Sequence, residues 1–304
     1  MKKNVFVVWL ALVFLTVPAI SSGGIPTVSE VTVTDVTPVS FSVVWVVSEP
    51  SNVSVNVFHA PECTNPVSGI LVSALSVDST GVSKATVTGL IPATAYCYQT
   101  VTTSKSTPDT TLSPATPQQF RTESEIVRTY MQGTDILPFG NDLIHHPVYR
   151  FDQTSGTGDI LLVSIAGSST PLSAWLGEGI TVPDALIDLN NVFGASTREN
   201  MNLIGEERMK LIEVRGADGC TLDRWRKVPI DYGLVEVKNP GACFMGDDLD
   251  CNDTVNILDI LRDIGGFNTS VGTFCFNSDL DVNGNGAVNI LDILQVIGKF
   301  GAVK

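Results

Sequence analysis

The chain ends with the stretch DLDCNDTVNILDILRDIGGF, Asp248 to Phe267, which returns as DVNGNGAVNILDILQVIGKF, Asp281 to Phe300, at an offset of 33 residues (248 to 281). In both copies, short oxygen-bearing side chains occupy positions 1, 3, 5, 9 and 12 of a loop, and position 7 would supply a backbone carbonyl. The residues concerned are Asp248, Asp250, Asn252, Thr254, Asn256 and Asp259, then Asp281, Asn283, Asn285, Ala287, Asn289 and Asp292. A loop of roughly twelve residues with this spacing can wrap one calcium ion, which takes oxygen ligands. Clusters of Asp, Asn and Gly are also ordinary turn formers, but two matches in register predict two bound calcium ions.

Position 6 of each loop needs a sharp turn. Gly286 supplies it freely in the second copy, whereas the first copy has Asp253. Asp visits the left-handed region more easily than most residues, so the turn is possible in both loops. We expect the first loop to be the more strained.

Each loop runs into an apolar helix whose large side chains recur at i, i+3, i+4 and i+7. The two stripes are Ile257, Ile260, Leu261, Ile264 and Phe267, and Ile290, Ile293, Leu294, Ile297 and Phe300. This spacing predicts that both stripes are core. Leu258 and Leu291 fall off the stripes, and they are either extra core between the two units or a paired apolar contact surface.

These residues resemble a type I dockerin, a tandem of loop-helix units in which each loop ends in Asp rather than Glu. The resemblance covers about the last 60 residues. It implies docking to a cohesin partner or another surface protein outside the cell, commonly in assemblies that degrade polysaccharide. In that family the partner is read at loop positions 10 and 11, often by small hydroxylated residues. This chain has Ile257-Leu258 and Ile290-Leu291 there, so the resemblance implies partner binding by these four residues but does not identify the partner.

The amino terminus has the pattern of an export signal, which we assign to residues 1–21. Lys2 and Lys3 precede an apolar run, and the small residues Ala19 and Ser21 suit cleavage before Ser22. The run is too short for a convincing membrane span, and no second one follows. We expect a secreted, extracellular or cell-surface protein with no membrane span in the mature chain.

Charge and cysteine content narrow the partners and the compartment. With 18 basic and 32 acidic residues the net charge is −14, which argues against nucleic acid as a partner. Six cysteines in an exported chain suggest three disulfides. The sequence does not fix the pairing, but locality favours Cys63–Cys97, Cys220–Cys243 and Cys251–Cys275.

Residues 22–123 alternate in short strands broken by Pro, Ser and Asn, which is typical of a β-sandwich. Trp45 lies in mid-strand among valines, as a core aromatic would. The segment GLIPATAYCY, Gly89 to Tyr98, resembles the E–F corner of a fibronectin type III domain. In that resemblance Tyr96 is the corner tyrosine, with its hydroxyl bonded back to the chain.

Residues 124–242 contain further strand-like runs between Gly-rich turns and predict a second β-rich domain of unknown type. The adjacent His145 and His146 would point apart on a strand, which is poor geometry for one metal. Trp175 and Trp225 are either a sugar-stacking platform or core. The stretch contains no catalytic motif, although a glycosidase needs only two well-placed acids.

The sequence thus predicts a mainly β chain: a signal peptide (1–21), a fibronectin type III-like sandwich (22–123), a β-rich domain (124–242) and a small helical dockerin-like calcium module (243–304). Our main hypothesis is a secreted, modular, non-enzymatic protein that docks to a protein partner. One alternative is a component of polysaccharide degradation whose middle domain binds or cleaves glycan. Another is a structural surface or adhesion protein in which calcium is only a staple.

Overall fold

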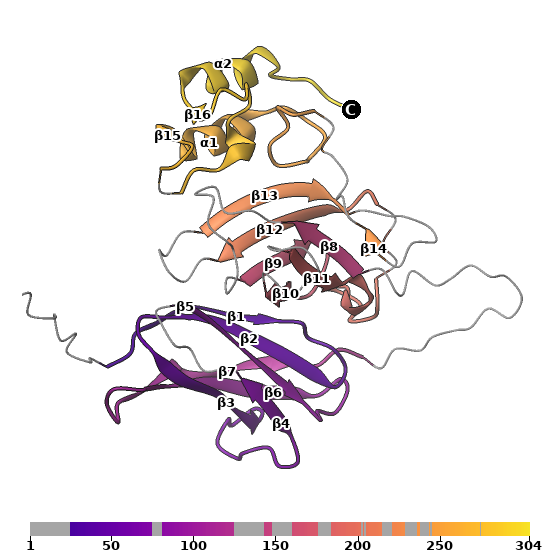
Figure 1. Ribbon diagram of the computed structural model, residues 1–304. Helices are drawn as coiled ribbons and strands as arrows, with labels where there is room; N and C mark the ends of the chain where they lie inside the picture. The colour runs from indigo at the N-terminus through magenta and orange to yellow at the C-terminus, as the bar shows by residue number, and fades with distance from the viewer. Residues whose placement is uncertain are drawn as a thin grey trace, which may run out of the picture.

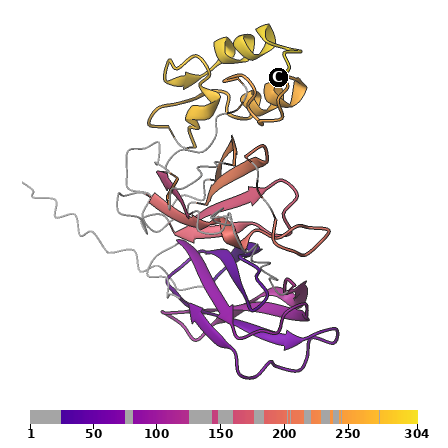
Figure 2. The ribbon, with the colours of Figure 1, turned by 90° about the vertical axis from the view of Figure 1, so that its right-hand side faces the viewer.

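The computed structural model describes residues 25–74, 81–124, 143–147, 160–175, 184–201, 203, 205–214, 221–228, 236–237, 243, 245–273 and 275–304. The predicted signal peptide lies outside these residues. The described chain is mainly β, as predicted, and its parts are stacked in three tiers (Figure 1). We call them the first sandwich (β1–β7), the middle part (β8–β14) and the module (residues 245–304). Figure 2 agrees that the middle part lies between the other two. Among the described residues, no helix has the length and apolar character to span a bilayer.

The first sandwich consists of two antiparallel sheets. One has the order β1-β2-β5-β4 and the other β3-β6-β7. The strands are β1 (Val28–Thr34), β2 (Ser40–Val47), β3 (Ser51–His59), β4 (Leu71–Ala74), β5 (Gly81–Thr88), β6 (Ala95–Ser104) and β7 (Thr110–Arg121). Trp45 is fully buried between the sheets, as predicted, and its indole nitrogen donates to Thr102 Oγ1 at 3.1 Å. This four-plus-three arrangement is that of seven-stranded sandwiches, and the type III assignment stays a prediction.

The tyrosine corner is present. The backbone N–H of Ile91 donates to the Tyr96 hydroxyl at 3.1 Å, and the ring of Tyr96 lies in the core. Because a buried hydroxyl needs a partner, this bond fixes the turn between β5 and β6. The predicted bond between the Tyr96 hydroxyl and the chain is therefore confirmed.

The second strand is apolar on both faces because it has two neighbours. Val43 and Trp45 point into the core of the sandwich, while Val44 packs with Ile160 and Leu162 of the middle part. In a strand, successive side chains point to opposite faces, so an unbroken apolar run indicates burial on both sides. The contact fixes the first sandwich against the middle part.

The middle part contains two small sheets. The first has the order β10-β9-β12-β13 and is antiparallel; the second has the order β11-β8-β14, with β14 parallel to β8. The strands are β8 (Leu143–Pro147), β9 (Ile160–Ile165), β10 (Leu172–Trp175), β11 (Asp184–Asp188), β12 (Arg208–Val214), β13 (Thr221–Lys227) and β14 (Glu236–Val237), with a short 3-10 helix η1 (Leu189–Asn191). His145 and His146 lie on β8, in successive strand positions as expected.

The module is a pair of loop-helix units related by the 33-residue offset. Its elements are α1 (Ile257–Gly265), β15 (Thr269–Ser270), the 3-10 helix η2 (Ser278–Leu280), β16 (Ala287–Val288) and α2 (Ile290–Gly298). β16 of the second loop pairs with β15, and at the matching place in the first loop Thr254 bridges to Val303 of the carboxyl-terminal tail. The tail thus completes the first unit as β15 completes the second.

The prediction that the helical stripes are core is wrong. Eight of their ten residues, all except Ile260 and Ile293, are exposed, between 46% and 59%. The module core comes instead mostly from the loops, β16 and η2, with one residue of α2: Leu249, Val255, Phe276, Leu280, Val288 and Val296. The reason is the rotation of the helices, because the inward face of α1 carries Asp259 and Asp263, both fully buried.

One disulfide matches the prediction and the others do not. Cys63 and Cys97 are bonded, with their Cα atoms 5.5 Å apart. Cys243 is bonded to Cys251, eight residues away, so the predicted pairings Cys220–Cys243 and Cys251–Cys275 are both wrong. Cys275 is disulfide-bonded as well, and Cys220 lies outside the described residues. Cys251 has a positive φ of 54°. Its partner Cys243 is only eight residues away, whereas the prediction had paired each of these two cysteines with a more distant one.

Candidate calcium loops and an exposed helix face

Three carboxylates of the first loop converge. Asp248, Asp250 and Asp259 each place an oxygen within 4.8 Å of the others, and all three side chains are buried. They stand at positions 1, 3 and 12 of the predicted loop, as the spacing requires. Oxygen-only donors gathered around one point are the set that calcium prefers.

Backbone N–H groups hold the first loop in a tight turn around these acids. Asp248 accepts from the N–H groups of Asn252 and Asp253, both at 3.0 Å, and Asn252 Oδ1 accepts from Thr254 N at 2.9 Å. Asp253 at position 6 has φ of 66°, the left-handed turn expected there. The loop is therefore closed by its own side chains.

The second loop repeats this pattern. Asp281 accepts from Asn285 N at 2.9 Å and from Gly286 N at 2.7 Å, and Ala287 N donates to Asn285 Oδ1 at 3.0 Å. Gly286 has φ of 87°. Several of its side chains, including Asn285, are more exposed than their counterparts in the first loop.

The last acid of each loop is also the third residue of the helix that follows. Asn256 caps α1, and Asp259 Oδ2 accepts from the Asn256 N–H at 2.7 Å; Asn289 and Asp292 form the same capping box on α2 at 2.8 Å. The other oxygen of Asp259 accepts from Asp250 N at 3.2 Å, back in the loop. Because position 12 must face the loop, the capping box sets the rotation of each helix and turns the apolar stripe outward.

The electrostatics of the first loop suit a cation. Burial raises the pKa of Asp248, the N–H groups of Asn252 and Asp253 oppose this, and the neighbouring Asp259 and Asp250 raise it further. Gathered carboxylates repel one another, and a divalent cation between them would remove that repulsion. The residues present therefore fit calcium in both chemistry and arrangement.

The exposed apolar face of the two helices consists of ten side chains in five pairs that obey the 33-residue offset. They are Ile257, Leu258, Leu261, Ile264 and Phe267 of the first unit, and Ile290, Leu291, Leu294, Ile297 and Phe300 of the second, each about half exposed. We call them the helix face. All four residues predicted to bind a partner, Ile257, Leu258, Ile290 and Leu291, belong to it. Large exposed apolar patches mark interaction sites in soluble proteins.

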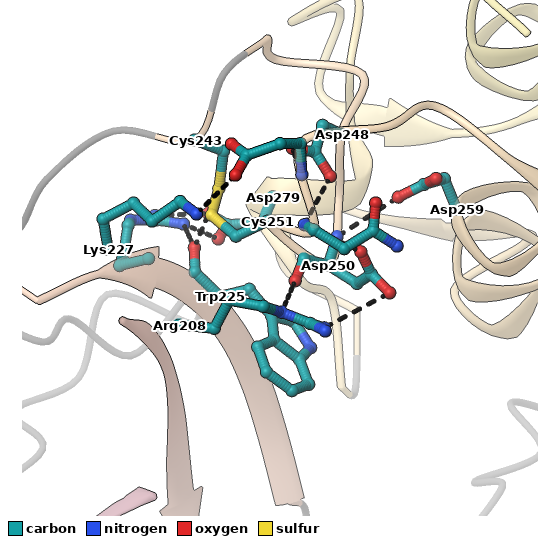
Figure 3. Close-up of a disulfide and its surroundings, with 12 residues drawn as sticks. Arg208, Trp225, Lys227, Cys243, Asp248, Asp250, Cys251, Asp259 and Asp279 are labelled. Carbon is teal, nitrogen blue, oxygen red and sulfur yellow. Dashed lines mark hydrogen bonds and ion pairs between the residues drawn. A yellow bond between two sulfur atoms is a disulfide. The ribbon is translucent and has the colours of Figure 1, made fainter. Parts of the chain in front are cut away.

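Sequence reasoning missed the residues that join the module to the middle part. Arg208 of β12 contacts Asp250, Lys227 of β13 contacts Asp253, and Asp223 of β13 contacts Arg262 of α1. Figure 3 shows Arg208 and Lys227 reaching up from the strands to the first loop, beside the Cys243–Cys251 bond. Only the fold brings these charges together, so no local pattern could have indicated them.

The two tryptophans of the middle part are engaged within the protein. Trp175 packs against the apolar cluster between the first sandwich and the middle part. The Trp225 ring lies under the Arg208 guanidinium, 4.5 Å from its centroid.

Comparisons with known proteins do not place this chain in a family. No protein-family model matches the chain, and no curated protein matches it. Among solved structures it is similar to two interface mutants of a type II cohesin–X-dockerin complex from Acetivibrio cellulolyticus. The carboxyl-terminal mutant is 20% identical with a TM-score of 0.22, and the amino-terminal mutant is 18% identical with a TM-score of 0.21; each match covers 53% of this chain and 96% of that chain. TM-scores this low do not establish a shared fold.

Proposed function

We propose that the chain is a secreted, non-catalytic modular protein whose module binds two calcium ions and docks to a separate protein through the helix face. The observation that carries this proposal is the exposure of ten large apolar side chains in five matched pairs, four pairs on two short helices and one pair just beyond their ends. A stable monomer gains nothing by leaving that surface in water, because apolar burial contributes roughly 25 cal/mol per Å². The disulfides Cys63–Cys97 and Cys243–Cys251 are consistent with an extracellular location.

Calcium has a defined part in this proposal. It would be held by Asp248, Asp250, Asn252, Thr254, Asn256 and Asp259 in the first loop, and by Asp281, Asn283, Asn285, Ala287, Asn289 and Asp292 in the second. Each loop ends on the capping box of its helix, so an ion in the loop stabilises the orientation of the helix. Calcium would thereby hold the helix face in its docking shape.

The partner that fits best is a cohesin-type domain, as the dockerin resemblance implies. Its contact would be apolar, since positions 10 and 11 of both loops are Ile and Leu. The near-identity of the two copies implies that the partner could bind in either of two orientations related by a pseudo-twofold turn.

The test has two arms. Calorimetric titration of the chelator-treated full chain should find two calcium ions per chain. A panel of immobilised cohesin-type domains should then capture the chain in calcium and release it in chelator. Binding of two ions without capture by any member of the panel would favour the structural alternative, in which calcium is only a staple. A chain that binds no calcium would contradict the proposal outright.

A further inference from the structure

Half of the differences between the two copies lie where the first copy contacts the chain before the module. Over their twenty paired positions the copies differ at eight. Four of the eight first-copy residues contact chain that precedes the module: Asp250, Cys251, Asp253 and Arg262. The corresponding residues of the second copy are Asn283, Gly284, Gly286 and Gln295, and within the described residues no hydrogen bond or ion pair joins these four to β12 or β13. Half of the divergence of the copies thus coincides with a contact surface.

Arg208 contacts Asp250, the position-3 residue of the first loop, at two points. Its Nε donates to the backbone carbonyl of Asp250 at 2.9 Å, and its guanidinium lies 3.3 Å from Asp250 Oδ2. The remaining oxygen, Asp250 Oδ1, accepts from Asn252 N at 3.1 Å inside the loop. The ring of Trp225 holds the guanidinium from the other side. Arg208 therefore fixes both the backbone and the carboxylate of a calcium-ligand position.

Two further links hold the same loop. Lys227, itself almost buried, donates to Asp253 Oδ2 at 2.9 Å, and Asp253 is the position-6 residue with positive φ. The disulfide from Cys243 holds Cys251 between them. A side chain at position 6 strains the turn, whereas a glycine would not, and here that side chain serves the contact with Lys227.

We propose that β12 and β13 form part of the first calcium site, with Arg208 as its positioning residue. The first loop is held in its binding shape before calcium arrives, and it binds calcium more tightly than the second loop. A nearby guanidinium also repels the ion, but Arg208 is paired with Asp250, a charge that the second loop lacks because it has Asn283 there. The net charge around the ion is therefore nearly the same in the two loops. The difference in calcium affinity then comes from the prior ordering of the first loop. This inference rests on the calcium binding proposed above.

The test compares Arg208→Gln with Arg226→Gln in the full chain. Arg226 makes an equivalent ion pair from β13 to Asp279, at 2.7 Å, outside both loops, and so it is the matched control. The first site is isolated by Asp292→Ala, which removes the last ligand of the second loop. In that background we expect Arg208→Gln to weaken calcium binding about tenfold and Arg226→Gln to leave it unchanged, as measured by calorimetry.

A metal-free measurement keeps the test independent of the Asp292 variant. In chelator, hydrogen exchange should be slower for amides 250–255 than for amides 283–288 of the otherwise unaltered chain, and Arg208→Gln should reduce that difference. Equal exchange in the two loops, or first-site binding that Arg208→Gln leaves equal or makes tighter, would overturn the inference while calcium binding stands. A parent chain that binds no calcium would overturn the inference and the proposed function together.

Discussion

Arg262 of α1 donates to both carboxylate oxygens of Asp223 in β13, each at 2.9 Å. It also donates to the Asp223 backbone carbonyl at 2.8 Å, and Asn277 of the module donates to the same carbonyl at 2.8 Å. A planar guanidinium matches a carboxylate in this two-point geometry. Asp223 is thus an anchor of the module on the middle part.

Acid should weaken this anchor. Burial alone would raise the pKa of Asp223, but Arg262 and then Lys210 outweigh it, and the net pKa is lowered. A lowered folded pKa means that Asp223 contributes stability above its unfolded pKa of about 3.9, and that this is lost as the pH falls through the folded value. Asp223→Asn should therefore destabilise the chain near neutral pH. It should also reduce the loss in free energy of unfolding that follows acidification. The free energy of unfolding in urea, measured for both proteins from neutral to acid pH, tests this prediction. Identical pH dependence in the two proteins would show that Asp223 has no such role.

Asp263→Val should stabilise the metal-free chain. Asp263 is fully buried with neither oxygen hydrogen-bonded within the described residues, and Val296 takes its place in the second copy. Burial, and then the charge of Asp292, raise the pKa of Asp263 to about 7. Because the folded pKa exceeds the unfolded one, stability falls as the pH rises from about 4 to about 7. In chelator we expect a gain of about 2–4 kcal/mol above pH 7 and little change below about pH 4. A loss of stability above pH 7 would mean that the carboxylate has a partner.

Tyr96→Phe tests the corner of the first sandwich. Removing the hydroxyl leaves the Ile91 N–H without its acceptor, which should cost about 1–2 kcal/mol in denaturant unfolding. Tyr98→Phe is the control, since its hydroxyl donates to the side chain of Gln118 at 3.2 Å rather than to the backbone of the turn. If the two variants lost equal stability, the bond at the corner would contribute no more to stability than the bond between Tyr98 and Gln118.

Much of the local structure could be predicted from the sequence, because the responsible interactions are local. The loop spacing placed Asp248, Asp250 and Asp259 together, and the turn at Asp253 followed from its position. The corner at Tyr96 and the bond between Cys63 and Cys97 were also predicted correctly.

The orientation of the helices could not be predicted from periodicity. The repeat of apolar residues identified α1 and α2 but did not say which side faces inward. Asp259 and Asp292, each at once loop end and capping residue, set that rotation. The contacts of Arg208 and Lys227 depend on how separate parts pack. The pairing of Cys251 with Cys243 was missed for another reason: the prediction assigned one disulfide to each region of the chain, whereas this bond joins two neighbouring regions.

Leu258→Ser and Leu291→Ser test whether the helix face is surface. Both side chains are about half exposed, so each change should alter the free energy of unfolding in calcium by less than about 1 kcal/mol. Ile293→Ala is the comparison, because Ile293 is 9% exposed and should lose roughly 2–5 kcal/mol. If a single Leu→Ser change proved as harmful as Ile293→Ala, Leu258 and Leu291 would be core after all.

The central claim is calcium-dependent docking through the helix face, and the affinity for an immobilised cohesin-type domain tests it most directly. The parent chain, both single Leu→Ser variants and the double variant should be measured in calcium and in chelator. We expect a modest loss in either single variant, because the other unit can still dock, and a loss of more than about a hundredfold in the double variant with its melting temperature unchanged. A double variant that binds like the parent chain, or binding that persists in chelator, would contradict the claim.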